Sequence, residues 1–75
     1  MPPRRPQIPW QRIAADLRRR LDEAEWATGD QLPSARALGE HYGVSAMTVG
    51  KALRALAAEG RVTVVPSWGV FVAER

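Results

Sequence analysis

Few side chains in this 75-residue sequence have the types and spacing that catalysis or metal binding requires. His41 is the single histidine and cysteine is absent, so the usual pairs of nucleophile and base, and the usual zinc ligands, are missing. The serines Ser34 and Ser45 fit helix caps, and the neighbouring carboxylates Asp22 and Glu23 fit the charged side of a helix. The sequence contains no glycine-rich phosphate loop. We therefore expect neither an enzyme nor a metal or other cofactor.

Positive charge is the feature with the clearest chemical consequence. Eleven basic residues, ten of them arginine, stand against eight acidic residues and give a net charge of +3. Arginine suits phosphate and guanine recognition, so this balance favours a nucleic-acid partner, with an ordinary basic surface as the alternative. The apolar runs are too short to cross a membrane and no signal peptide is visible. Together with the absence of cysteine, this predicts a cytoplasmic protein with no membrane partner.

Hydrophobic spacing divides the chain into a short arm and one small domain. Residues 1–9 contain four prolines and two arginines, which predicts a flexible, extended arm, and residues 10–75 suffice for a single domain. The apolar residues Trp10, Ile13, Leu17 and Leu21 recur at helical spacing and predict a helix over 10–25. We expect Arg18–Arg20 on its outer sides to pair with nearby carboxylates, with phosphate contact as the less favoured alternative.

Two more helices are predicted on either side of a tight turn. Ser34 caps a helix over 35–42, Gly43 can take the left-handed conformation that ends it, and Ser45 caps a helix over 45–59. Gly39 lies inside the first of these helices, where glycine costs about 0.5–1 kcal/mol relative to alanine, so we expect a close contact with the following helix. With the apolar residues Leu38, Val44, Val49 and Leu53, this indicates a helix-turn-helix, with a plain αα-hairpin as the alternative.

Extended segments are predicted before and after this motif. A very short strand is expected near Leu32, because the residue before Pro33 favours extended backbone. After Gly60, β-branched and aromatic runs over 61–65 and 70–73 predict a β-hairpin. The expected fold class is therefore mainly α with a small β-hairpin, a winged helix-turn-helix of three helices and a two-stranded wing.

From Trp10 to Ala73 the sequence resembles the N-terminal DNA-binding domain of the GntR family of bacterial transcription regulators. The matching blocks are Gly29–Ser34 with Arg36, Gly43–Ser45 with Thr48 and Val49, Glu59 with Gly60, and Gly69 with Phe71 and Val72. The resemblance implies sequence-specific binding of a palindromic operator by a homodimer, and we expect a repressor. It also implies that the helix over 45–59 enters the major groove and that the wing over 61–73 lies near the minor groove or the backbone.

The resemblance implies roles for single residues as well. Arg36 matches a DNA-contacting arginine, Ser45 and Thr48 match phosphate-binding hydroxyls, and Gly69 matches a wing-tip glycine that lets the backbone approach DNA. Ala46 and Gly50 stand where the family usually has arginine, so two guanine-reading side chains are missing. The residues expected to contact DNA are Ser34, Arg36, Ser45, Ala46, Met47, Thr48, Gly50, Lys51, Arg54, Ser67, Trp68 and Gly69.

The wing departs from the family pattern, because Val64, Val65 and Trp68 are apolar where basic residues are common. Trp68 can wedge against a sugar or base, contact a protein, or fold back onto its own hairpin. The alternative function is accordingly a winged-helix module for protein interaction or dimerisation with weak DNA binding. Family members continue into a larger effector-binding domain, and we expect no effector site within this chain.

Overall fold

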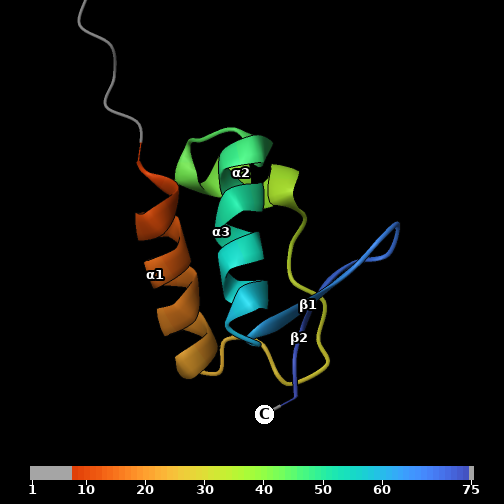
Figure 1. Ribbon diagram of the computed structural model, residues 1–75. Helices are drawn as coiled ribbons and strands as arrows, with labels where there is room; N and C mark the ends of the chain where they lie inside the picture. Colours follow the sequence, from red (N-terminus) through yellow and green to blue (C-terminus); the bar gives the residue numbers. More distant parts are fainter. Residues whose placement is uncertain (1–7, 75) are drawn as a thin grey trace, which may run out of the picture.

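The computed structural model describes residues 8–74, and these fold into three helices followed by an antiparallel hairpin (Figure 1). The elements are α1 (Trp10–Asp22), α2 (Ala35–Tyr42), α3 (Ala46–Ala58), β1 (Val62–Val65) and β2 (Gly69–Val72). This order confirms the predicted winged helix-turn-helix. The predicted arm over 1–9 lies outside the described residues except for its last two. None of the helices in the described part of the chain is long and apolar enough to cross a bilayer.

The first helix is shorter than predicted. It ends at Asp22 rather than at residue 25, because Ala24 takes a left-handed backbone conformation with φ 57°. The Glu25 N–H donates to the Arg20 carbonyl at 3.0 Å, which is the bond that closes a helix of this type. Glycine usually occupies the left-handed position, so alanine there gives no local signal in the sequence.

The helix-turn-helix forms where the sequence predicts it. Gly43 ends α2 in the left-handed conformation with φ 72°. A Cβ on Gly39 would lie 2.7 Å from the Val44 carbonyl oxygen and 3.4 Å from the Ala46 nitrogen. The expected close contact is therefore confirmed, and its partner is the backbone of the turn and of the first residue of α3.

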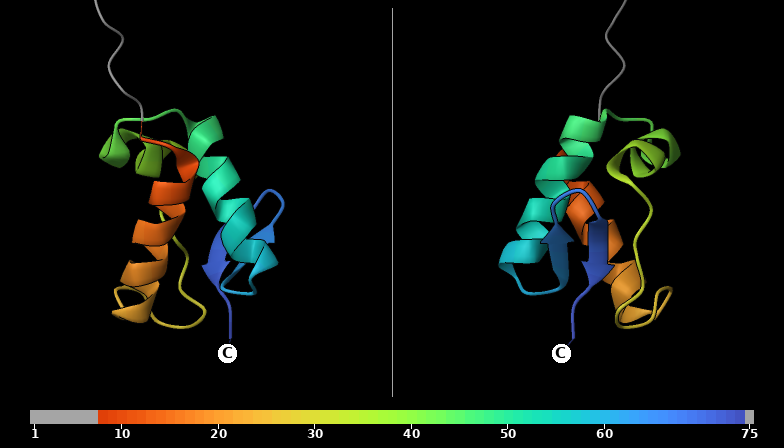
Figure 2. Two further views of the ribbon diagram at one scale, coloured as in Figure 1. Left: turned by 60° about the vertical axis from the view of Figure 1, so that its left-hand side comes forward. Right: turned by 90° about the vertical axis from the view of Figure 1, so that its right-hand side faces the viewer.

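The core is built around α3, which contacts α1, α2 and β1 and lies between α1 and the hairpin (Figures 1 and 2). One face of each helix is buried, together with Leu32 and Val62. The buried set is Ile13, Ala14, Leu17, Leu32, Leu38, Val49, Ala52, Leu53, Leu56 and Val62. This core is what holds α3 with its opposite face exposed.

The hairpin pairs with a third segment of chain. β1 and β2 are antiparallel, and Val65 faces Gly69, so Gly69 belongs to β2 and the connection is 66–68 rather than the predicted 66–69. On its other edge, β2 meets Gln31 in a β-bridge with Phe71, and the Leu32 N–H donates to the Val70 carbonyl at 2.8 Å. The very short strand expected near Leu32 is thus confirmed as a bridge that ties the α1–α2 connection to the wing.

Candidate nucleic-acid interface

Serine caps set the starts of both motif helices. The Ser34 hydroxyl oxygen accepts from the Ala37 N–H at 3.0 Å, and the Ser45 hydroxyl oxygen accepts from the Thr48 N–H at 3.2 Å. Ser45 Oγ also lies 3.1 Å from Thr48 Oγ1. Each helix start carries unpaired N–H groups and partial positive charge, which favour a phosphate. Because a capping hydroxyl accepts through its lone pair, the Ser34 hydrogen stays available for a phosphate oxygen, and the Ser45–Thr48 pair keeps one hydroxyl hydrogen that is not used between the two.

The outer face of α3 presents the residues expected to face the major groove. Ala46, Lys51 and Arg54 are exposed, and Met47 is 77% exposed. A Cβ on Gly50 would meet nothing within 4 Å. Unlike Gly39, Gly50 is therefore not required by the packing of the described residues.

Arginines in the second half of α1, and Arg61 just before β1, are neutralised by carboxylates. The pairs are Arg18 with Glu59, Arg19 with Asp16 and Glu23, Arg20 with Glu25, and Arg61 with Asp22. The Arg18 pair is bidentate, at 2.9 and 2.6 Å. This hydrogen bonding lowers the pKa of Glu59 below its ordinary value. The expectation that the Arg18–Arg20 run pairs with nearby carboxylates is confirmed.

Cations on α2 and α3 are not neutralised in this way. Arg36 is 89% exposed at its side chain, with only a loose 3.9 Å approach to Glu40. Within residues 8–74, the side chains of Lys51 and Arg54 make no hydrogen bond or ion pair. The fold therefore separates cations with internal partners from cations that face solvent on the motif helices.

Arg12 is a further cation that faces solvent without an internal partner among the described residues, and the sequence analysis did not select it. It is exposed in the first turn of α1 and makes no ion pair within the described residues. It lines a shallow hollow with Asp16 and Tyr42, and the start of α1 lies at the end of the molecule that carries α2 (Figure 1). The sequence alone held no signal for this, because Asp16 lies four positions along the same helix and its pairing with Arg19 is seen only in the structure.

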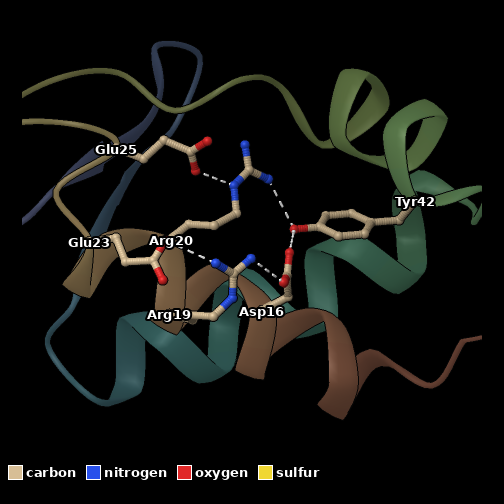
Figure 3. A network of polar contacts seen from close by, with 6 residues as sticks. All are labelled: Asp16, Arg19, Arg20, Glu23, Glu25 and Tyr42. Carbon is tan, nitrogen blue, oxygen red and sulfur yellow. Dashed lines mark hydrogen bonds and ion pairs between the residues drawn. The ribbon is translucent and has the colours of Figure 1, made fainter.

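A polar network fixes α2 against α1 (Figure 3). The Tyr42 hydroxyl donates to Asp16 Oδ2 at 2.6 Å, and Arg20 donates to the same hydroxyl oxygen at 3.0 Å. The hydrogen bond from Tyr42, followed by that from Arg19, lowers the pKa of Asp16. Burial, followed by the hydrogen bond to Asp16, raises the pKa of Tyr42. The network sets the position of the helix that carries Arg36.

The wing tip is held from the side by Gln31, which sequence reasoning did not select. Its Nε2 donates to the Trp68 carbonyl at 2.8 Å. A Cβ on Gly69 would lie 2.4 Å from the same nitrogen, which is the end of a side chain that can shift, whereas the φ of 131° at Gly69 itself favours glycine. The Trp68 side chain is 75% exposed and therefore does not fold back onto the hairpin.

The fold brings these elements to one end of the molecule. The turn of the hairpin points toward the end that holds α2 and the start of α3, and away from the end of β2 (Figures 1 and 2). Helix α2, the first turn of α3 and the tip of the hairpin thus lie toward the same end of the molecule (Figures 1 and 2). Their contacts with DNA stay predictions. Residues 8–74 contain no group of three or more histidine, cysteine, aspartate or glutamate residues placed to hold a metal ion.

Comparison with known proteins gives a consistent result. The model of the gntR family of bacterial regulatory proteins matches residues 9–72. The uncharacterized HTH-type transcriptional regulator YjiR of Escherichia coli (strain K12) is 36% identical over 66 residues, covering 88% of this chain and 14% of that protein. The Exu regulon transcriptional regulator of the same strain is 34% identical over 67 residues, covering 89% and 26%. The histidine utilization repressor of Klebsiella aerogenes is 32% identical over 65 residues, covering 87% and 27%. The chain thus spans about a quarter or less of these relatives.

Solved structures share the same fold. The possible transcriptional regulator YydK of Bacillus subtilis superposes with a TM-score of 0.81 at 29% identity, covering 92% of this chain and 30% of that one. AraR(DBD) in complex with operator ORX1 superposes with a TM-score of 0.83 at 24% identity, covering 89% and 82%.

Proposed function

This chain belongs to the gntR family of bacterial regulatory proteins, and we propose that it is the DNA-binding domain of a repressor that recognises a palindromic operator as a homodimer. The family is one of regulators, which confirms the predicted resemblance and the expectation that the chain is not an enzyme. One observation carries the proposal. Arg18–Arg20 of α1 and Arg61, which precedes β1, have carboxylate partners, whereas Arg36, Lys51 and Arg54 face solvent on the motif helices.

The proposed docking places the outer face of α3 in the major groove. Lys51 and Arg54 then neutralise phosphates, and the hydroxyls of Ser45 and Thr48 position the start of the helix against the backbone. Ser34 does the same for α2. Phosphate contacts of this kind fix the register of the helix without reading the bases.

Base recognition in this proposal differs from the usual family pattern. Ala46 and Met47 offer apolar contact to thymine methyl groups, and Gly50 lets the helix axis approach the base edges. Arg36 is the remaining candidate for bidentate contact with guanine, which is worth about 1–3 kcal/mol of discrimination. The operator is therefore expected to be richer in A·T pairs under α3, with a guanine within reach of α2.

The relatives support repression at an operator. One of them is named a histidine utilization repressor, and a structure with the same fold is titled as a complex with an operator. Action at an operator places the domain with the chromosome in the cytoplasm, and palindromic operators match the two-fold symmetry of a dimer.

A random-sequence duplex selection with the purified domain tests the proposal. Enrichment of a palindromic site with one guanine per half-site is the expected result. If no duplex is enriched over the starting pool, and only weak binding of all duplexes is found at low salt, sequence-specific operator binding is refuted.

Exposed apolar side chains favour a second function, a protein-interaction or dimerisation module. Met47 and Trp68 are 77% and 75% exposed, and Val64 is 48% exposed. An assembly made through these residues would respond little to salt, whereas binding through phosphates weakens steeply as salt rises. Sedimentation of the domain without DNA, at low and high salt, distinguishes the two functions.

A further inference from the structure

The wing of this domain has no charged side chain with which to hold DNA. Residues 62–72, which form β1, the turn and β2, contain no lysine, arginine, aspartate or glutamate. The exposed side chains of this segment include Val64, which is 48% exposed, and Trp68, which is 75% exposed and lies in the turn. If the wing touches DNA, its contacts are apolar or come from the backbone rather than from ion pairs with phosphates.

The backbone of the tip is fixed so that the Trp68 side chain stands in solvent. The Trp68 N–H donates to the Val65 carbonyl at 3.0 Å, and its own carbonyl accepts from Gln31 Nε2 at 2.8 Å. Ser67 takes a left-handed conformation with φ 67°, which non-glycine residues seldom adopt. With this backbone, the indole is 75% exposed and lacks most of the hydrophobic contacts that a large aromatic side chain normally makes. Such an arrangement favours a partner that supplies those contacts.

The shape of the tip favours DNA as that partner. The neighbours of Trp68 in the turn are Pro66 and Ser67, and Gly69 follows, so one large apolar group protrudes from small residues. A single protruding side chain is far from the roughly 1,000 Å² that a stable protein interface buries. It has the form of the apolar wedges that enter the minor groove and separate two stacked base pairs.

We propose that Trp68 inserts between two base pairs from the minor groove while α3 occupies the neighbouring major groove. This inference rests on the proposed operator binding and adds to it a position at which the DNA is unstacked. The wing tip points toward the end of the molecule that carries the start of α3, as the insertion requires (Figures 1 and 2). Pyrimidine–purine steps unstack most easily, so the wedge selects a TA or CA step beside the segment that α3 reads. Gln31 acts as a positioning residue, because it holds the carbonyl of the wedge residue.

The test uses the 75-residue chain and its selected operator, with 2-aminopurine placed in turn at each adenine. Binding of the wild-type domain should raise the fluorescence at one step in each half-site. Trp68→Ala should abolish this rise and weaken binding by about 5- to 150-fold, the range found when an aromatic side chain that stacks on a base is removed. The dependence of affinity on salt should not change, because Trp68 neutralises no phosphate. Trp68→Phe should keep most of the fluorescence rise.

Two further variants control for indirect effects. Val64→Ala removes exposed apolar surface from the wing but not from its tip, and should leave both fluorescence and affinity unchanged. Gln31→Met keeps the length of the side chain but cannot donate to the Trp68 carbonyl, so it should reduce the fluorescence rise although Trp68 is still present. Circular dichroism verifies that each variant retains its helices.

The outcomes separate this inference from the proposed function. If the wild-type domain binds its operator with no fluorescence change at any step, or Trp68→Ala binds as the wild type does, the wedge is refuted. Operator binding then stands if Arg36→Ala still weakens it. If Trp68→Ala converts a dimer into a monomer while the affinity for one half-site is kept, the tip is a protein contact and the wedge is likewise refuted. If the wild-type domain binds no duplex specifically, the proposed function itself fails.

Discussion

Gly39 lies against the carbonyl of Val44, so close that a Cβ on Gly39 would come within 2.7 Å of the oxygen. Gly39→Ala should therefore destabilise the domain, although alanine is the better helix former. The added methyl group meets backbone rather than a movable side chain, and overpacking of this kind costs about 1–3 kcal/mol. Urea denaturation followed by circular dichroism measures the change in the free energy of unfolding.

Gly50 provides the matched control, since it is also a glycine inside a helix but a Cβ there meets nothing within 4 Å. Gly50→Ala should stabilise the domain by about 0.5–1 kcal/mol, because glycine loses more backbone entropy on folding. Equal effects of the two substitutions would contradict the packing role assigned to Gly39. If Gly50→Ala binds the operator more weakly despite its greater stability, the absence of a side chain at position 50 is needed for the helix to approach DNA.

Acid should weaken the contact between α1 and α2 through Asp16. The hydrogen bonds from Tyr42 and Arg19 hold the pKa of Asp16 below its ordinary value in the folded domain. The stability from this lowered pKa is fully present above the unfolded pKa of about 4 and is lost as the pH falls through the folded pKa. Urea midpoints measured from pH 7 down to acid should fall less for Asp16→Asn than for the wild type. If the urea midpoints of the two proteins fall in parallel as the pH is lowered, Asp16 does not contribute to the loss of stability in acid.

Arg36 should carry a large share of base recognition, since Ala46 and Gly50 cannot read guanine. Arg36→Ala should weaken operator binding and relax the preference at one base pair, by about 1–3 kcal/mol if the contact is bidentate. Competition with operators changed at single positions measures the preference. Arg18→Ala is the control, because the Arg18 side chain is paired with Glu59, outside the network that positions α2, and its loss should leave selectivity intact. An unchanged preference in Arg36→Ala would exclude Arg36 from base recognition.

Ala46→Arg should introduce a guanine contact at the start of α3. Ala46 is exposed in the first turn of the helix, next to the Ser45 cap, so the longer side chain meets no core residue. We expect tighter binding or a new preference for guanine at one position in a repeated duplex selection. A selected sequence and affinity identical to those of the wild type would mean that α3 docks in a different orientation from its relatives.

Local signals in the sequence were sufficient for most of the fold. Ser34 and Gly43 delimited α2, and Val49 and Leu53, two of the apolar residues assigned to the motif, lie on the buried face of α3. The end of α1 was predicted wrongly, because Ala24 takes the left-handed conformation, which alanine seldom adopts. Contacts between distant segments could not be read from local patterns either. Gln31 and Trp68 are 37 positions apart, and only the packing of the α1–α2 connection against β2 brings them together.

The same reason limited the prediction of the candidate site. Residue types showed that the chain is basic. Which arginines lack a carboxylate partner, and so can neutralise a phosphate, depends on the folded chain. Arg18 reaches Glu59 across 41 positions and is neutralised, whereas Arg12, on the same helix, makes no ion pair within the described residues. Tertiary structure therefore determines the charge available to DNA.

The salt dependence of operator binding tests the central claim most directly, namely that cations without internal partners at the α2–α3 end contact DNA. With Lys51 and Arg54 each neutralising one phosphate and Arg36 reading a base, the slope of log affinity against log salt should be about −1.8 per protomer. If Arg12 adds a third phosphate contact, the slope should be about −2.7 and Arg12→Ala should reduce its size by about 0.9, whereas Arg19→Ala should leave it unchanged. A slope near zero for the wild-type domain would contradict the account, because binding would then not involve these charges.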